Sequence, residues 1–140
     1  MEIDELKKAC QAELEEAGVT LRDDPERKLA VFRLVIGKMP KEGLAKFRQV
    51  MLRANFLGGE IAGARLAVSS DDEIILSQTL PLAQTDGTIA ASSVRRLSGV
   101  AEVWRQLLDD YPPAAARQKA EAEEDVRLTR RMVASAFLRA

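Results

Sequence analysis

Residues 64–82 read ARLAVSSDDEIILSQTLPL, and this stretch decides the fold class. Two runs, 64–68 and 73–80, are rich in aliphatic side chains, and the polar residues 69–72 separate them. Strand-like runs joined by a short polar turn are typical of an antiparallel hairpin, and Pro81 ends the second run. Because alternate residues of a strand share a face, apolar residues of both runs can gather on one side, and the hairpin is expected to have a buried face. That face carries Leu66, Val68, Ile74, Leu76 and Leu80.

A further strand is predicted upstream of the hairpin, over residues 29–36, which follow a charged turn at 23–25. This stretch is dense in β-branched and aromatic residues, which favour strands. The two-residue period puts Phe32, Leu34 and Ile36 on one face and Val31, Arg33 and Val35 on the other. The short stretch 19–22 is predicted to pair with this strand.

Three amphipathic helices are predicted around these strands, because apolar residues recur at three- and four-residue steps. The first spans 3–17 and is followed by Gly18, which suits a left-handed helix stop. The second spans about 41–55 and follows Pro40. The third begins near residue 90. Their apolar stripes are Ile3, Leu6, Cys10, Leu14 and Ala17; Leu44, Phe47, Val50, Met51 and Ala54; and Val94, Leu97, Ala101, Trp104, Leu108 and Tyr111. Cys10 is interpreted as a small core residue rather than a reactive thiol.

The order of helix, strands, helix, hairpin and helix predicts an α+β fold with a short antiparallel sheet packed against helices. One domain is expected over residues 1–111. Pro112 and Pro113 then break the last helix, and a mixed-charge segment follows. Residues 112–140 are therefore predicted to form an added C-terminal helical extension.

Composition places the 140-residue chain among soluble globular proteins, with 46% apolar and 31% charged residues. A net charge of −1 and 4% aromatic residues make nucleic acid an unsuitable partner. No apolar run reaches the roughly 20 residues that span a bilayer, and Met1 is followed by acidic residues instead of the basic start of a secretory signal. We therefore expect a cytoplasmic protein without membrane contact. With one cysteine, the chain can form no internal disulfide.

The residues that usually carry catalysis or bind metal are scarce. The chain has no histidine and a single cysteine, so nucleophile–histidine pairs and ordinary zinc sites cannot be built. Gly58 and Gly63 have the outer spacing of a phosphate loop, but Ala64 and Arg65 follow where lysine and serine or threonine are needed. We predict a protein that is not an enzyme and needs no cofactor. The alternative at this stage is an enzyme that uses carboxylates and arginines alone.

Three stretches in this order resemble a known family. VMLRANFLGG at 50–59 resembles a helix that ends in an Ala-Asn-Phe signature before a glycine-bearing loop. The hairpin at 64–82 is similar to a small-residue strand, an acidic turn and a strand closing in Leu-Pro-Leu, and VAEVWRQLL at 100–108 to a last helix with a late tryptophan. The family with this pattern is the Tir chaperone family of class I type III secretion chaperones. Its members usually have about three strands between the first two helices, whereas residues 19–37 have room for two.

The resemblance implies a homodimeric chaperone that binds the N-terminal segment of a secreted effector and keeps it soluble and competent for secretion. By analogy with the family's second helix, the dimer interface is assigned to Leu44, Phe47, Val50, Met51 and Ala54. The apolar effector-binding surface is assigned to Leu6, Leu14, Val31, Val35 and Ile75.

Two alternatives remain open at this point. The chain could instead be a non-enzymatic α+β interaction or regulatory module that binds a folded partner. The extension at 112–140 could pack across the dimer or contact proteins of the secretion apparatus.

Overall fold

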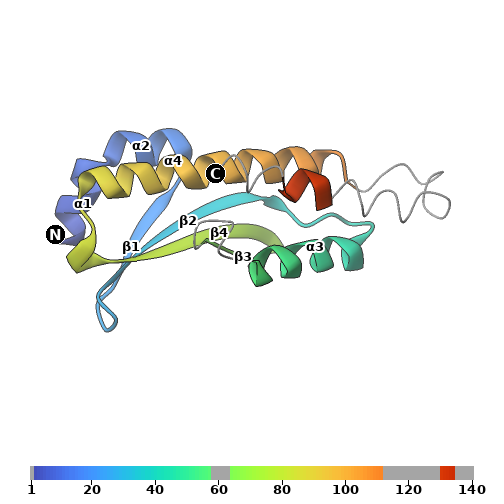
Figure 1. Ribbon diagram of the computed structural model, residues 1–140, viewed down its shortest axis with the longest axis horizontal. Coiled ribbons are helices and arrows are strands. Elements are labelled where there is room, and N and C mark those ends of the chain that lie inside the picture. The colour runs from blue at the N-terminus through green and yellow to red at the C-terminus, as the bar shows by residue number, and fades with distance from the viewer. Residues whose placement is uncertain (1, 58–63, 112–129, 135–140) are drawn as a thin grey trace.

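The computed structural model describes residues 2–57, 64–111 and 130–134. Its centre is a four-stranded antiparallel sheet with the strand order β1-β2-β4-β3. Helices α1, α2 and α4 lie together along one side of the sheet, and α3 lies beside β3 (Figure 1). The predicted α+β class and its antiparallel sheet are confirmed. None of the helices in these ranges is long and apolar enough to cross a membrane.

The predicted hairpin is present as β3 (Arg65–Val68) and β4 (Glu73–Pro81). Leu66, Ile74 and Leu76 are buried as expected, and Leu80 is half-buried. The prediction was wrong for Val68, which is 43% exposed. It lies at the end of an edge strand and therefore beyond the helices that cover its neighbours.

The strand predicted at 29–36 is β2 (Leu29–Lys38), and the stretch predicted to pair with it is β1 (Thr20–Asp24). Phe32 lies opposite Leu21 on β1, and Leu34 lies opposite Leu76 on β4. These side chains, with Ile36, are buried on the face of the sheet that the helices cover. Two strands therefore precede α3, in agreement with the short region noted in the sequence.

The first predicted helix is two helices, α1 (Ile3–Ala9) and α2 (Gln11–Ala17), which meet at Cys10. The Cys10 backbone leaves the helical region, with φ −123° and ψ 22°. The break was missed because the apolar period continues through it. Gly18 ends α2 in the left-handed conformation that was predicted, with φ 69°.

Cys10 is completely buried, as its assignment to the core predicts. Its Sγ donates a hydrogen bond to the carbonyl oxygen of Leu6 at 3.1 Å. Burial, aided by the nearby charge of Glu13, raises the pKa of the thiol. The thiolate is therefore disfavoured as long as the protein is folded.

We expect Cys10 to react with a thiol-specific alkylating agent about 100-fold more slowly than a free thiol at neutral pH, because reaction requires an opening of the structure. Mass spectrometry along a urea titration measures this directly. Labelling should rise together with the unfolding transition seen by circular dichroism. Rapid labelling of the folded protein would contradict the burial of Cys10.

The long helix α4 (Gly87–Asp109) provides most of the cover for the sheet. It begins where the Asp86 side chain accepts a hydrogen bond from the backbone N–H of Ile89 at 2.8 Å. A short 3-10 turn, η2 (Leu82–Gln84), connects it to β4. The predicted stripe is confirmed in its centre, where Val94, Leu97, Ala101 and Trp104 are buried.

Helix α3 (Leu44–Phe56) begins three residues later than the sequence suggested. Gly43 precedes it in a left-handed conformation, with φ 66°, and its carbonyl oxygen accepts a hydrogen bond from the Tyr111 hydroxyl at 2.7 Å. The ring of Phe47 lies edge-on to Trp104, with 6.0 Å between ring centroids, and 5.2 Å from the ring of Tyr111. These contacts fix the start of α3 to the end of α4.

Helix α4 ends at Asp109, and the domain boundary expected after residue 111 stays a prediction. Residues 130–134 are helical, and Val133 is buried as part of the hydrophobic core. The remaining residues of the predicted extension, 112–129 and 135–140, and the glycine-bearing segment 58–63 lie outside the described residues.

Candidate functional site

One face of the sheet is turned away from α1, α2 and α4, and we call it the open face. It consists of the alternate strand residues whose neighbours are buried beneath the helices. Three of the predicted effector-binding residues lie on it: Val31 and Ile75 are half-buried, and Val35 is 44% exposed. Val35 lies directly opposite Ile75, whereas Val31 pairs with Thr79, four positions further along β4. The open face therefore offers neighbouring apolar side chains on a pleated surface.

A β-bulge shapes this surface at one end of β2. Val35 pairs with Ile75 and Gly37 with Ile74, so Ile36 is an extra residue in β2. Arg105 of α4 donates hydrogen bonds to the carbonyl oxygens of both bulge residues, Val35 at 3.0 Å and Ile36 at 3.1 Å.

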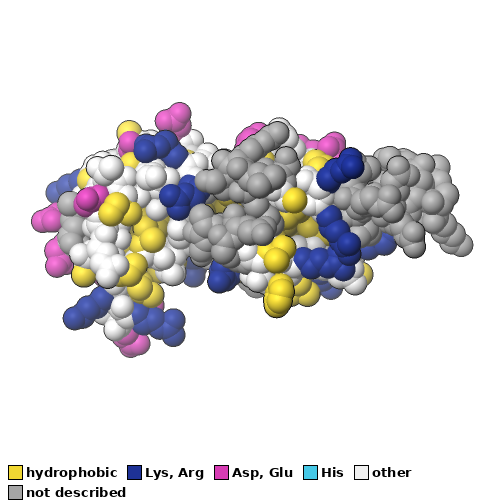
Figure 2. Space-filling model, viewed as in Figure 1, with side chains coloured by type: hydrophobic (Ala, Val, Ile, Leu, Met, Phe, Trp, Pro, Cys, Tyr) yellow, Lys and Arg dark blue, Asp and Glu magenta, His cyan; other side chains and the backbone are white. Residues whose placement is uncertain are grey.

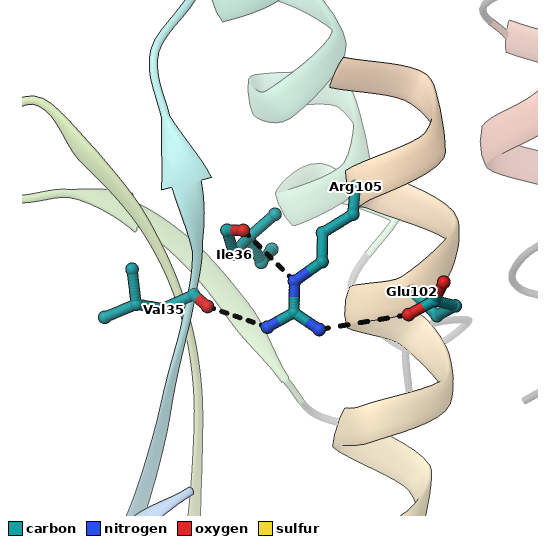
Figure 3. A network of polar contacts seen from close by, with 4 residues as sticks. All are labelled: Val35, Ile36, Glu102 and Arg105. Carbon is teal, nitrogen blue, oxygen red and sulfur yellow. Dashed lines mark hydrogen bonds and ion pairs between the residues drawn. The ribbon is translucent and has the colours of Figure 1, made fainter. Parts of the chain in front are cut away.

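Figure 3 shows the Arg105 guanidinium between α4 and β2, while the Val35 side chain points away from it. Glu102 lies 3.9 Å from the guanidinium and keeps a carboxylate beside it. Arg105 therefore links the bulge to α4 on the covered side of the sheet. Its hydrogen bonds hold the backbone of Val35 in place, while the Val35 side chain lies on the open face. Sequence reasoning missed Arg105 because its partners lie 69 and 70 positions away.

The two other predicted effector-binding residues lie elsewhere. Leu6 is completely buried in the protein's own core and is not available to a partner in this conformation. Leu14 is half-buried and lines a shallow hollow of about 320 Å³ between α1, α2 and β1, together with Leu21 and Lys7. This hollow lies next to β1 on the helix side, so it extends the apolar surface around that edge of the sheet.

The two edges of the sheet differ. β3 is the last strand on one side, and the Asn55 side chain of α3 occupies its outer edge. The Asn55 amide donates to the Leu66 carbonyl oxygen at 2.7 Å and accepts from the Leu66 N–H at 2.8 Å. This pair of bonds imitates the pairing of another strand. Within the part of the chain that the structure describes, β1, the last strand on the other side, pairs with β2 and with no other strand. Its outer edge is the one suited to the addition of a strand.

The residues predicted to form the dimer interface mostly face inward. Phe47, Val50, Met51 and Ala54 are buried within the single chain, and Leu44 is half-buried. The stripe that carries them is therefore the face by which α3 joins its own domain. The sequence indicated this helix but not which of its faces is free.

A second apolar surface of α3 points outward, and we call it the α3 patch: Leu52, Phe56 and Leu57, which are 68%, 89% and 46% exposed. Figure 2 shows apolar side chains gathered over this part of the molecule, with lysine and arginine side chains beside them. Such large apolar side chains left in water are typical of a binding surface. The i, i+4 spacing of Leu52 and Phe56 was the signal in the sequence that could have identified it.

Within the described ranges, no group of three or more histidine, cysteine, aspartate or glutamate side chains is arranged to hold a metal ion. The features described above suit the binding of a polypeptide: an apolar sheet face, an unpaired strand edge and an exposed apolar helix surface.

Comparison with known proteins identifies the fold family. The model of the Tir chaperone protein (CesT) family matches residues 9–105, which is more than two thirds of the chain. The chain belongs to the Tir chaperone protein family. The family predicted from the sequence is thus confirmed, and the match includes every strand and both helices α2 and α3.

Among solved structures, the chain is similar to one from a structure described as the ExsC-ExsE complex. The two share 16% sequence identity with a TM-score of 0.61, and the match covers 76% of this chain and 95% of that one. At this identity the likeness concerns the fold, which is the Tir chaperone fold described above. No curated protein matches the chain.

Proposed function

We propose that this protein is a cytoplasmic type III secretion chaperone that binds the N-terminal segment of a secreted effector in an extended form. The observation that carries the proposal is the open face, where Val31, Val35 and Ile75 remain accessible. The outer edge of β1, which pairs with no second strand of the described ranges, adds to it. Membership of the Tir chaperone protein family supports it. So does the similarity to a chain whose structure is described as a complex of two proteins.

The binding mode follows from the chemistry of these surfaces. An extended chain that lies along the open face would cover Val31, Val35 and Ile75 with its apolar side chains. A flanking part of the same chain would pair with the outer edge of β1, satisfy its backbone hydrogen bonds and place side chains over the hollow at Leu14. Each methylene group removed from water adds about 0.8 kcal/mol to such binding. No covalent chemistry is needed, so we propose no catalytic residue and no cofactor.

The direct test is co-expression with the products of neighbouring genes, followed by affinity capture and size exclusion with light scattering. We expect one stable complex in which limited proteolysis leaves an N-terminal fragment of the partner protected by the chaperone. Protection of a folded domain instead of an N-terminal segment would favour the alternative of an interaction module for folded partners.

We further propose that the protein is a homodimer formed through the α3 patch. Leu52 and Phe56 lie one turn apart on the outer side of α3, and Leu57 continues the surface at its end. A two-fold axis that brings two such helices together would bury these side chains against their copies. The earlier assignment to α3 is kept, but the contact moves from its buried stripe to its exposed side.

We expect Phe56→Glu to convert the dimer into monomers, because an interface that buries a carboxylate without a partner loses several kcal/mol. Light scattering across a dilution series measures the change, which should correspond to an increase in the dimer dissociation constant of about 100-fold or more. Phe56 is 89% exposed in the single chain, so the monomer should remain folded.

Lys46→Glu serves as the matched control, since it also places a new carboxylate on an exposed position of α3, but on a different side of the helix from Leu52 and Phe56. It should leave the dimer largely intact. A Phe56→Glu variant that stays dimeric would show that the α3 patch is not the interface.

A further inference from the structure

Three arginines share the open face with the apolar residues of the proposed effector site. Arg22 lies on β1, Arg33 on β2 and Arg65 on β3, and all three are exposed. Thr20 pairs with Arg33, Arg33 pairs with Ser77, and Ser77 pairs with Arg65, so one row across the sheet holds two arginines. The chain as a whole carries a net charge of −1, which makes this face more basic than the rest of the molecule.

Basic and apolar residues alternate along β2 on the open face. The row beside Arg33 consists of Val35, Ile75 and Ala67, and the row on its other side contains Arg22 and Val31. Neighbouring rows lie about 6.8 Å apart, and the two arginines that flank Ser77 lie about 10 Å apart. Along β2, a partner therefore meets apolar Val31, basic Arg33 and apolar Val35 in succession.

Among the described residues, no carboxylate forms an ion pair with any of these three arginines. The ion pair within 4.0 Å in these ranges joins Arg105 to Glu102 and involves none of the three. Arg65 donates to the carbonyl oxygen of the adjacent Ala64 at 2.9 Å. The carboxylates of the open face are at the ends of its strands. Asp24 accepts a hydrogen bond from the Arg27 backbone N–H, and Glu73 lies opposite Lys38 in the strand register.

The absence of these pairs constrains the partner. A wholly apolar segment laid on the open face would remove the Arg33 guanidinium from water without replacing its hydrogen bonds, which is unfavourable. A carboxylate at the same position would form a charge-assisted and often bidentate contact with the guanidinium. Apolar side chains two residues away on either side would meet Val31 and Val35.

We propose that the open face selects extended segments in which an acidic residue lies between two apolar residues at alternate positions, in the pattern apolar–x–acidic–x–apolar. This inference rests on the proposed function, because it names the chemistry of the effector segment that the same face would bind. The acidic position lies over Arg33, with Arg22 and Arg65 within reach on either side.

Labelled synthetic peptides of about 12 residues, enough to run the length of β2 at roughly 3.3 Å per residue, test the proposal. The first probe repeats Leu-Ser-Glu-Ser, and its two twins replace every Glu with Gln or with Lys. Fluorescence anisotropy should give the tightest binding for the Glu probe, and this binding should weaken as salt is raised. The Lys probe should bind at least about tenfold more weakly.

Charge reversal locates the contact. Arg33→Glu should weaken binding of the Glu probe by about tenfold and strengthen binding of the Lys probe, because the sign of the charge is inverted. Arg96→Glu, an equal charge change at an exposed position of α4, should leave the order of the three probes unchanged. Circular dichroism confirms that both variants are folded.

The outcomes separate this inference from the proposed function. If all three probes bind equally and Ile75→Asp weakens all of them, the open face binds peptides without selecting acids, and the inference is overturned while the function stands. If the Glu probe binds best but Arg33→Glu does not change the order, the acidic position is not over Arg33 and the inference also fails. If neither the probes nor the co-expressed partner bind, both this inference and the proposed function fail.

Discussion

Val31→Asp and Ile75→Asp are each expected to abolish capture of the effector segment while the chaperone remains a folded dimer. Both side chains lie on the open face and are half-buried in the free protein. At Ile75, a bound apolar side chain would bury the introduced carboxylate without a partner, at a cost of several kcal/mol. At Val31, the carboxylate would replace the apolar contact with a charge and would also lie opposite Arg22, where it would occupy an arginine that the segment would otherwise meet. A cost of this size corresponds to a loss of affinity of about 100-fold or more. Isothermal titration calorimetry with the co-purified effector segment measures the loss.

The position of Val35 supplies a variant with little risk to folding. Val35 is 44% exposed, so Val35→Asp disturbs the free protein less than a change at Val31. It should also weaken capture, since Val35 lies directly opposite Ile75. Gln84→Asp introduces the same charge at an exposed position of η2 and should have no effect. Normal capture by folded Val31→Asp, Val35→Asp and Ile75→Asp variants would remove the open face from the proposed function.

The sequence predicted the elements of this fold well because each has a local signal. The alternation in β2 identified its buried residues Phe32, Leu34 and Ile36, and Gly18 marked the end of α2. The break at Cys10 has no such signal, because its apolar neighbours keep the helical period on both sides. The exposure of Val68 depends on where the covering helices end, which is a property of the tertiary structure.

The candidate site was predicted only in part, for a different physical reason. Periodicity identifies an apolar stripe but does not say whether that stripe packs in its own domain or on a partner. Leu6 and Phe47 were expected at binding surfaces, and both are completely buried in the single chain. Val31, Val35 and Ile75 are on the open face because α1, α2 and α4 cover the opposite one. The arrangement of helices therefore determines which apolar residues remain for a partner.

Truncation of the Asn55 side chain to alanine is expected to destabilise the protein strongly, although it removes only a small polar group. This side chain makes two hydrogen bonds to the Leu66 backbone, and Asn55→Ala would leave both backbone groups of this edge residue without these partners. Losing them should lower the free energy of unfolding by about 2–4 kcal/mol. Urea denaturation followed by circular dichroism measures the change. Lys46→Ala, at an exposed position of the same helix, should cost less than about 0.5 kcal/mol.

Asn55→Asp separates hydrogen bonding from shape, because the two side chains have nearly the same size. The introduced carboxylate would accept from the Leu66 N–H, but it would also face the Leu66 carbonyl oxygen, to which the amide now donates. Protonation restores a donor, so the pKa of this carboxyl should be raised in the folded state. The stability that the protonated carboxyl contributes is then present below its pKa in the unfolded chain, about 4. It is lost as the pH rises through the pKa of the same carboxyl in the folded protein. Relative to the natural protein, the variant should therefore be less destabilised near pH 4 than near pH 7.

The same substitutions test how the two sheet edges are distinguished. With Asn55 in place, the outer edge of β3 is occupied at Leu66, and β1 is the edge left for a partner strand. Asn55→Ala should open the β3 edge and increase self-association at high protein concentration, because an unpaired strand edge is a template for other strands. Light scattering of the folded variant should show this as species larger than the dimer. An unchanged size distribution, together with an unchanged free energy of unfolding, would mean that Asn55 neither supports β3 nor protects its edge.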